Sequence, residues 1–309
     1  MRCRWVILSP SGTGDGYRAA MRCIEITGAG VELVALEAGT GGRPLLLVHG
    51  FTGAKEDFAH PVFGAHPVLG TEVERLAAQG CWVVAPDHRG HGSSGHPPLE
   101  SDYSLELMAQ DMWAVVDELG WDRFDLLGHS MGGMIVQIMA TTRPERIDRL
   151  ILMDTHHGPV PGIDREVVEL GRQLARSDGL AVIAEVLASL ADPADAVAFE
   201  RVCAEHPGYR AWSEQKMLAC SPAMYSAMLG LFVDVPDRLE SLAAIDREVL
   251  VLVGELDRAF VGASHRMAEV IPNVTLAVLP AAGHCPQFEA TEAWRDAVDS
   301  FLGLGSTPS

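Results

Sequence analysis

The chain has few basic residues for its length. Its 309 residues include 42 Asp and Glu but only 23 Lys and Arg, which gives a formal net charge of -19. Only two of the basic residues are lysines, Lys55 and Lys216. Because so acidic a chain repels phosphate backbones and anionic lipid surfaces, its composition argues against a nucleic-acid-binding protein and against a membrane-bound one.

The chain also has no long apolar run. No segment approaches the roughly 18 apolar residues that a membrane-spanning helix needs. Near the N-terminus, the apolar stretch 5–8 is shorter than the roughly 7 to 15 residues of a signal-peptide core. Six cysteines are scattered without C-x-x-C spacing, which is typical of free thiols in a reducing compartment. These absences predict a soluble, cytoplasmic protein.

The remaining composition favours one large globular unit. Hydrophobic residues make up 48% of the chain, which is enough for a sizeable core and excludes a disordered or fibrous protein. The segment 9–20 is rich in Gly and Ser and precedes a second methionine, Met21, after which strand-like patterning begins. We therefore expect residues 1–20 to be a disordered tail or an overextended start before Met21, and residues 305–309 to form a short C-terminal tail.

Short apolar runs alternate with longer segments of helical period along most of the chain, which is typical of β-α-β units around a mostly parallel sheet. Strands are predicted at 23–27, 31–37, 44–48, 82–85, 124–127, 150–153, 249–253 and 274–279, the first two as a hairpin. Helices are predicted at 67–79, 104–119, 131–142, 262–271 and 290–302. The pattern predicts an α/β fold.

Between residues 155 and 237 the alternation stops, and only helical periodicity remains. Helices are predicted there at 164–176, 179–190, 194–205, 209–219 and 223–232. This block leaves the sheet at the carboxyl end of the strand 150–153, the end at which open α/β sheets bind ligands. The sequence therefore predicts a core of residues 21–154 and 238–304 with a helical lid of residues 155–237 over its site.

One pentapeptide carries a nucleophile pattern. Ser130 stands between Gly128 and Gly132, directly after the predicted strand 124–127. This is the sequence form of a nucleophile elbow, a strained strand-to-helix turn that exposes a serine hydroxyl at the top of a sheet. A β-carbon two residues before or after the serine would collide with its neighbours in so sharp a turn, so both positions favour glycine.

A serine nucleophile needs a general base and an acid that orients the base. His284 follows the last predicted strand and is the candidate base, and Asp257 follows the seventh and is the candidate acid. Phe51, after the third strand, and Met131, directly after the serine, would supply the two backbone N–H groups of an oxyanion hole. Ser130, Asp257 and His284 follow one another in the order expected for this architecture.

These motifs resemble those of the alpha/beta hydrolases, and the resemblance covers roughly residues 23 to 304. It rests on five motifs in the expected order, at residues 49–51, 87–94, 128–133, 254–257 and 283–284. The resemblance implies a mostly parallel eight-stranded sheet with helices on both faces and an inserted all-helical lid. It implies no cofactor.

Within this family, the residue at the elbow separates branches of activity. Haloalkane dehalogenases and epoxide hydrolases of the fold use an aspartate there, so Ser130 argues against both activities. Carbon-carbon bond hydrolases that act on ring-cleavage products of aromatic compounds keep the serine and a similar lid, but often carry a tryptophan after the base. Cys285 occupies that position here, which weakens this interpretation without excluding it.

Other acidic residues compete for the role of Asp257. Asp154 and Asp234 are the alternatives, and some members of the fold place the acid after the strand that ends near Asp154. Asp154 is more simply explained as the start of the lid connection. Glu255, which lies between Gly254 and the candidate acid, is expected on the surface.

Two histidine pairs and one cysteine also invite a functional interpretation. His88 with His91, and His156 with His157, suggest metal binding, but no Cys or carboxylate pattern completes a set of three or four ligands, so no metal site is predicted. We expect His88 and His91 to shape the loop near the oxyanion side, and His156 and His157 to line the hinge of the lid. Cys285 is expected to be a packing residue and not a reactive thiol.

The expected function is hydrolysis of a carboxylic ester through a serine acyl-enzyme. The predicted lid is rich in Leu, Val, Ala and Met, which favours a small to medium apolar substrate. The alternative is hydrolysis of a carbon-carbon bond in a keto acid, or of an enol-lactone, and a buried arginine among Arg172, Arg176 and Arg210 would favour it. A non-catalytic ligand-binding protein of this fold is a further alternative. The expected partner is a small molecule, and assembly into a homo-oligomer stays open.

Overall fold

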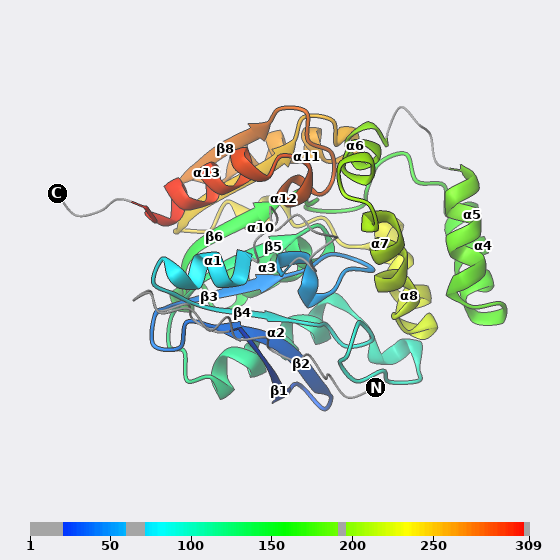
Figure 1. Cartoon of the computed structure of the whole chain (residues 1–309), viewed down its shortest axis with the longest axis horizontal. Helices are drawn as coiled ribbons and strands as arrows, with labels where there is room; N and C mark the ends of the chain where they lie inside the picture. The colour runs from blue at the N-terminus through cyan, green and yellow to red at the C-terminus, as the bar shows by residue number, and fades with distance from the viewer. Residues whose placement is uncertain (1–20, 60–71, 191–195, 306–309) are drawn as a thin grey trace.

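The computed structural model describes residues 21–59, 72–190 and 196–305 (Figure 1). The expected N-terminal tail, residues 1–20, lies outside the described residues. The same holds for residues 306–309 of the expected C-terminal tail and for the first part of the predicted helix 67–79.

Eight strands form one sheet, as the sequence predicts. In chain order they are β1 (Arg22–Thr27), β2 (Glu32–Ala38), β3 (Arg43–Val48), β4 (Cys81–Pro86), β5 (Phe124–His129), β6 (Ile147–Met153), β7 (Glu248–Gly254) and β8 (Val274–Leu279). Their order across the sheet is β1-β2-β4-β3-β5-β6-β7-β8. β1 pairs antiparallel with β2, which confirms the predicted hairpin, and β2 is antiparallel to β4. All other pairs are parallel.

Helices cover both faces of the sheet. Alternate residues of each strand point to opposite faces, and since both sets are apolar, each face packs against helices. In β3, Leu46 and Val48 belong to one core cluster, which also contains residues of α2, α3 and α11. Leu45 and Leu47 belong to the other, which contains residues of α1 and α13. These helices are α1 (Glu72–Ala78), α2 (Leu105–Glu118), α3 (Met131–Thr142), α11 (Arg258–Val270) and α13 (Thr291–Leu302).

Several one-turn helices have no counterpart in the prediction. They are η1 (Lys55–Phe58), η2 (Glu100–Asp102), η3 (Pro144–Arg146), α10 (Leu239–Leu242) and α12 (Pro286–Glu289). Each has three or four residues, which is too short to show a helical period in sequence. Of these, α12 lies between His284 and α13, where the sequence analysis expects only a loop before the helix 290–302. The predicted helix 262–271 is α11, which begins earlier, at Arg258.

Within the described residues, seven helices lie between β6 and β7: the one-turn α10 and, before it, a run of six. These are α4 (Arg165–Ser177), α5 (Leu180–Leu190), α6 (Val197–Glu205), α7 (Tyr209–Leu218), α8 (Pro222–Leu229) and α9 (Leu231–Asp234), and we call them the helical segment. The predicted helix 223–232 is in fact two helices that meet at Gly230. The helical segment lies beyond one end of the sheet, at the right of Figure 1. Within it α8 packs on α4, and it contacts the core where α8 meets η2 and α6 meets α12.

No single helix in the described ranges is long and apolar enough to cross a membrane. In these ranges one bent pair of helical stretches reaches the required length and apolarity. It consists of α7 and of α8 continued by α9, and the two stretches meet at an angle of 93°. Tyr209, Met224 and Tyr225 of this pair are buried inside the protein, as is usual for helices that pack against a core.

Candidate active site

Ser130 occupies the turn between β5 and α3, at the carboxyl end of the sheet. Its backbone angles are φ 54° and ψ -118°, a conformation that residues other than glycine rarely adopt. The predicted strain of the elbow is therefore present. The Ser130 N–H donates to the Met153 carbonyl at 2.9 Å, and the Thr155 hydroxyl donates to the Ser130 carbonyl at 2.7 Å, so neighbouring backbone holds the strained turn in place.

The glycines on either side of the elbow are required by the packing. A β-carbon at Gly128 would lie 2.5 Å from the Gly132 carbonyl oxygen, and one at Gly132 would lie 2.3 Å from the Val48 carbonyl oxygen. Both distances are far inside van der Waals contact, and the atoms in conflict belong to closely packed backbone. The collision that the sequence pattern predicts is confirmed at both positions.

His284 lies in the loop between β8 and α12 and contacts Ser130 and Asp257 with its two ring nitrogens. Nε2 is 2.9 Å from Ser130 Oγ, and Nδ1 is 2.8 Å from Asp257 Oδ2. The neutral tautomer that fits both contacts donates its Nδ1 proton to Asp257 and accepts the Ser130 hydroxyl proton at Nε2. The structure thus brings the three predicted residues together in one chain of hydrogen bonds.

Two opposing effects act on the pKa of His284. Burial lowers this pKa, but the charge and hydrogen bond of Asp257 together with the charge of Glu289 raise it by more, so the pKa lies above its usual value. Asp257 is the N-cap residue of α11, and only 9% of its surface is exposed. A raised proton affinity suits a base that must take the proton of a hydroxyl group.

The residues predicted as oxyanion donors belong to two segments that lie next to Ser130. Gly50, which follows β3, packs so closely on the serine that an added β-carbon would be 3.0 Å from Ser130 Cβ. Phe51 comes next in the chain, and Met131 is the first residue of α3. The N-terminus of α3 adds positive charge at this point, which favours a developing oxyanion.

Aromatic side chains surround the candidate oxyanion loop. The Phe51 ring packs against the rings of Tyr225 and Phe232, with centroids 4.9 and 5.4 Å apart. Burial raises the pKa of Tyr225 to about 12, so its hydroxyl stays neutral. The centroid of the Phe260 ring lies 4.6 Å from that of the His284 ring. Because Tyr225 and Phe232 belong to α8 and α9, the helical segment meets the core directly at this loop.

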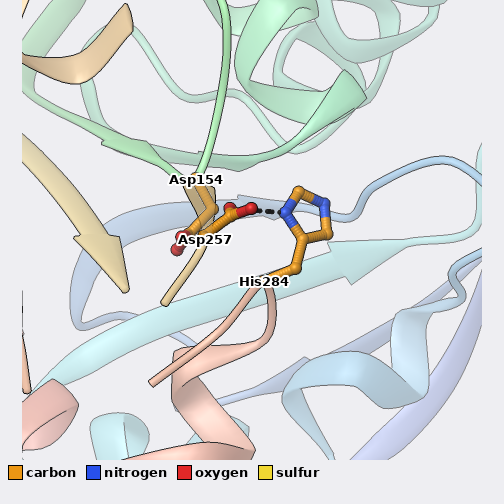
Figure 2. A group of neighbouring side chains, drawn as sticks. All are labelled: Asp154, Asp257 and His284. Atoms are coloured by element: carbon orange, nitrogen blue, oxygen red, sulfur yellow. Dashed lines mark hydrogen bonds and ion pairs between the residues drawn. The ribbon is translucent and has the colours of Figure 1, made fainter. Parts of the chain in front are cut away.

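Asp154, the first alternative acid, lies beside Asp257 (Figure 2). Its side chain is fully buried, and its carboxyl, the Asp257 carboxyl and a ring nitrogen of His284 lie within 4.8 Å of one another. Asp154 Oδ1 accepts the Gly254 N–H at 2.9 Å, whereas the bond to His284 is made by Asp257. Burial and the neighbouring Asp257 raise the pKa of Asp154 well above its usual range. Asp154 is thus part of the site as well as the start of the connection to α4.

The other two acidic residues lie away from these contacts. Asp234 pairs with Arg165 at the surface, where both side chains are more than half exposed. Glu255 is exposed and accepts the Ala281 N–H at 3.1 Å. The surface position predicted for Glu255 is confirmed, and Asp234 is not close enough to serve as the acid in this arrangement.

His129 is a residue of the site that the sequence reasoning missed. Its Nε2 lies 2.7 Å from the His284 carbonyl oxygen, to which it donates a proton. Burial lowers the pKa of His129 to about 3, so the ring stays neutral. The residue directly before the nucleophile therefore fastens the loop of the candidate base to the elbow. Its place inside the pentapeptide is the only sequence signal that could have found it.

Buried histidines join the loops that follow β3 and β4. The His88 N–H donates to His49 Nε2 at 3.1 Å, and His88 Nε2 lies 3.1 Å from the His49 carbonyl oxygen. The ring of His91 packs 5.0 Å from that of His49. Burial lowers the pKa of all three below the usual value, so they are neutral. Since His49 precedes Gly50 and Phe51, these contacts support the candidate oxyanion loop, as predicted for His88 and His91.

His156 and His157 lie where the helical segment leaves the core. Their rings stack with centroids 4.6 Å apart. His157 Nδ1 donates to Asp237 on the returning chain at 2.8 Å, and its Nε2 accepts from Arg266 of α11 at 3.0 Å. His157 thus joins the chain that leaves the core to the chain that returns to it, and the role of the pair as the hinge of a lid stays a prediction.

Asp154, Asp257 and His284 are also the one set of His, Cys, Asp and Glu side chains, within the described part of the chain, whose donor atoms could converge on a cation. Both ring nitrogens of His284 are already engaged, one by Asp257 and one by Ser130. The arrangement therefore fits a chain of proton donors and acceptors better than a metal site.

Cys285 packs beside the buried group Val202, Tyr209 and Phe288. Burial raises the pKa of its thiol well above the usual value, so the reactive thiolate is disfavoured. The packing role expected for Cys285 is confirmed.

Comparisons with known proteins agree with this geometry. Residues 43–291 match a family model described as alpha/beta hydrolase fold. Over 298 residues the chain is 28% identical to "Putative carbamate hydrolase RutD" of Caulobacter segnis, covering 94% of this chain and 98% of that protein. It is also similar to the solved structure of a thermophilic esterase from Thermogutta terrifontis, at 28% identity and a TM-score of 0.73, covering 91% and 98% of the two chains. An enol-lactonase from Burkholderia xenovorans LB400 shares the fold, with a TM-score of 0.75 at 21% identity over 91% of this chain and 100% of that one.

Proposed function

The chain belongs to the alpha/beta hydrolase family, and within that family we propose that it is a serine hydrolase that cleaves a carboxylic ester of a small to medium apolar substrate. One observation carries the proposal. Ser130 Oγ, His284 and Asp257 form a single chain of hydrogen bonds with lengths of 2.9 and 2.8 Å. This arrangement supplies a nucleophile, a base and an orienting acid from the protein itself, without a cofactor.

In the first half of the proposed reaction, Ser130 Oγ attacks the carbonyl carbon of the ester while His284 Nε2 takes the hydroxyl proton. The carbonyl oxygen becomes negative in the tetrahedral intermediate and accepts hydrogen bonds from the Phe51 and Met131 N–H groups. His284 then gives its proton to the leaving alcohol oxygen. The carbon-oxygen bond breaks, and the acyl group stays on Ser130.

In the second half, water takes the place of the alcohol. His284 removes a proton from the water, the resulting hydroxide attacks the acyl carbon, and the proton returns to Ser130 Oγ as the acid leaves. Asp257 keeps its hydrogen bond to Nδ1 throughout. It thereby holds the tautomer that leaves Nε2 free to accept a proton in each half-reaction.

The apolar character of the substrate is supported by the side chains near the elbow. Phe51, Tyr225 and Phe232 form one aromatic group on the oxyanion side, and Phe260 packs on His284. Rings in these positions favour an apolar acyl or alcohol group. The similarity to the Thermogutta terrifontis esterase also favours an ester as the substrate.

Cleavage of a carbon-carbon bond in a keto acid, or of an enol-lactone, is the alternative. The keto acid carries a carboxylate and would need a cation facing it. Arg172 and Arg176 both pair with Glu100, and Arg210 pairs with Glu200. All three arginines that could favour this alternative are therefore already paired with carboxylates of the protein itself. The ester remains the better-supported substrate.

We further propose that the protein works in the cytoplasm as a hydrolase of small molecules. Cys81, Cys203, Cys220 and Cys285 are thiols in the structure. Thiols in this number suit a reducing compartment, and the acidic charge of the chain, -19, disfavours nucleic acid as a partner.

The test of the proposed function compares Ser130→Ala with a matched variant, Ser189→Ala, whose hydroxyl is exposed on α5 and bonds only locally to the Val186 carbonyl. In Ser130→Ala the rate of p-nitrophenol release from short-chain esters should fall by a factor of about 10⁵ to 10⁶. This variant should also no longer be labelled by a fluorophosphonate probe. Ser189→Ala should be labelled like the parent. Labelling that persists in Ser130→Ala would overturn the assignment.

A substrate panel tests the choice of ester. Esters of graded acyl length are compared with enol-lactones and with ring-cleavage diketo acids at equal concentration. We expect the highest kcat/KM on short to medium esters. Faster turnover of a diketo acid by the parent, lost in Ser130→Ala, would instead establish the alternative substrate on the same site.

A further inference from the structure

A second buried carboxyl group lies beside the acid of the proposed triad. Asp154 directly follows β6, and its side chain is 0% exposed. Oδ1 accepts the Gly254 N–H at 2.9 Å, whereas the buried Oδ2 has no hydrogen-bond partner among the described residues. Figure 2 shows this carboxyl group next to that of Asp257, whose other neighbour is the His284 ring. An unpaired buried oxygen next to a carboxylate needs an explanation, because either a charge or a hydrogen-bonding group is unsatisfied there.

A proton shared between the two carboxyl groups removes one negative charge and gives the unpaired oxygen of Asp154 a hydrogen-bond partner. Two ionised carboxylates this close and this deeply buried repel each other, so one of them must hold a proton. Glu289, whose carboxylate accepts the Gly283 and Cys285 N–H groups at 2.7 and 3.1 Å, adds negative charge from α12. Burial together with Asp257 raises the pKa of Asp154 well above its usual range.

The hydrogen bonds decide which carboxyl group is protonated. Asp257 accepts the Nδ1 proton of His284, a role for which an ionised carboxylate is best suited. Asp154 Oδ1 accepts from the Gly254 backbone, which leaves only Oδ2 to carry a proton. With a proton on Oδ2, Asp154 can donate to Asp257, and the buried oxygen gains its missing partner.

We propose that Asp154 is a positioning residue of the catalytic site, held as a neutral carboxylic acid that donates a hydrogen bond to the Asp257 carboxylate. The proposal rests on the proposed function, because it concerns the acid of that triad. Among the described residues Asp154 has no hydrogen bond to the Ser130 hydroxyl, which bonds to His284. It acts by fixing the Asp257 carboxylate in the direction of His284 and by partly neutralising its charge, which limits the proton affinity of His284.

The protonation state is tested directly by infrared spectroscopy on the full chain. The difference spectrum of the parent minus Asp154→Asn at pH 7 should contain the C=O stretching band of a protonated carboxyl group. The surface variant Asp234→Asn is the matched control and should remove only bands of an ionised carboxylate. A parent-minus-Asp154→Asn spectrum with only ionised carboxylate bands would overturn the proposal.

Kinetics test the positioning role with two variants of the same residue. In Asp154→Asn the amide N–H₂ can donate to Asp257 while the amide oxygen accepts from Gly254, so the rate should stay within about threefold of the parent. Asp154→Ala lacks the donor, and we expect a rate about tenfold or more below the parent. On the acid side, the pH profile of kcat/KM should also move to higher pH in Asp154→Ala. His284 then faces a carboxylate with its full charge, which raises the pKa of His284.

A purely structural role for Asp154 predicts a different result. It would lower the melting temperature of Asp154→Ala but leave the acid limb at the pH of the parent, and that outcome would overturn the proposal. A loss in Asp154→Asn as large as that in Asp257→Asn would also overturn it, because it would make Asp154 an ionised acid. Failure of the proposed function is distinguishable: the parent would then not react with a fluorophosphonate at Ser130, whereas the infrared band does not depend on activity.

Discussion

The carboxyl end of the sheet and the helical segment α4 to α9 are held by different kinds of interaction. At the sheet end, many contacts are buried and involve backbone, as in the 2.9 Å bond from the Gly254 N–H to Asp154. In the helical segment many contacts are ion pairs at the surface. Arg176 pairs with Glu100 at 2.6 Å although their side chains are 40% and 31% exposed. Such exposed pairs contribute only about 0 to 1 kcal/mol each.

This difference suits the two regions to different tasks, the sheet end to catalysis and the helical segment to the choice of substrate. Catalysis needs the reacting groups within about 0.5 Å of their productive positions, and the sheet end supplies closely packed backbone for that purpose. The helical segment contacts the candidate oxyanion loop through Tyr225 and Phe232, which pack on Phe51. We therefore expect substitutions at the sheet end to lower kcat for every substrate. Substitutions in the helical segment should instead change the preference among substrates.

After Ser130→Ala, the largest expected effect at the sheet end comes from Asp257→Asn. The asparagine amide can donate to His284 Nδ1 and so favours the tautomer whose Nε2 carries a proton and cannot accept one from Ser130. We expect kcat for p-nitrophenyl acetate to fall by about 10⁴ with little change in the melting temperature. Asp234→Asn is the control and should retain the parent rate. Near-normal activity of Asp257→Asn would show that Asp154 serves as the acid.

The second prediction concerns the packing that supports the elbow. In Gly132→Ala the new β-carbon would lie 2.3 Å from the Val48 carbonyl oxygen and 2.5 Å from that of His49. Since β3 must then move away from the elbow, we expect a loss of stability of about 1 to 3 kcal/mol. We also expect a fall in kcat of about 10²-fold, as the oxyanion loop shifts with the strand.

Gly262→Ala on α11 is the matched control for this substitution. Its β-carbon would meet only the Arg266 side chain, at 3.5 Å, so the melting temperature should stay the same or rise slightly. Thermal unfolding and kcat measured on both variants make the comparison. If Gly132→Ala were as stable and active as the parent, the tight backbone packing at the elbow would not be what holds Ser130.

Lys216 of α7 provides a buried contact between the two regions, and it sharpens the comparison. Its ammonium group bonds to Asp57 of η1, where the two side chains are only 14% and 6% exposed, and lies 3.9 Å from the Trp212 ring centroid. Lys216→Met leaves Asp57 buried without this partner, and we expect a loss of unfolding free energy of about 3 to 5 kcal/mol in urea titrations.

The control for this prediction is an exposed pair in the same segment. Arg210→Met breaks the pair with Glu200, whose side chains are 57% and 52% exposed, and should cost less than about 1 kcal/mol. The double variant Lys216→Met with Asp57→Asn should recover part of the loss, because no charge is then left buried. Equal losses in Lys216→Met and Arg210→Met would mean that burial does not distinguish the contacts of this segment.

The sequence predicted the parts of this structure that depend on local pattern. All eight strands were predicted, and α3 was predicted with its observed bounds because the elbow fixes its start at Met131. β6 begins at Ile147, earlier than predicted, since the partly exposed Asp148 and Arg149 interrupt its apolar run. The break at Gly230 was missed because glycine costs only about 1 kcal/mol in a helix and does not by itself end one.

The parts of the site that depend on contacts across the fold could not be predicted in the same way. Ser130, Asp257 and His284 were found because each follows a strand, and parallel strands bring their carboxyl ends together. The bond from His129 to the His284 loop and the place of Asp154 beside Asp257 join residues far apart in the chain. Periodicity carries no information on which loops meet. The contacts of α8 and α9 with Phe51 were missed for the same reason.

The smallest expected effect, and the sharpest test of the division of tasks, comes from Phe232→Ala in α9. Removing this ring opens space beside Phe51 without touching the hydrogen bonds of Ser130, so kcat on p-nitrophenyl acetate should change little. For esters with a longer acyl chain, the lost apolar contact should raise KM by up to about tenfold. Leu170→Ala on α4, where the leucine is 56% exposed, is the control and should leave both esters unaffected. An equal fall in kcat on every ester would mean that Phe232 supports the oxyanion loop, and then the helical segment would share in catalysis as well as in substrate choice.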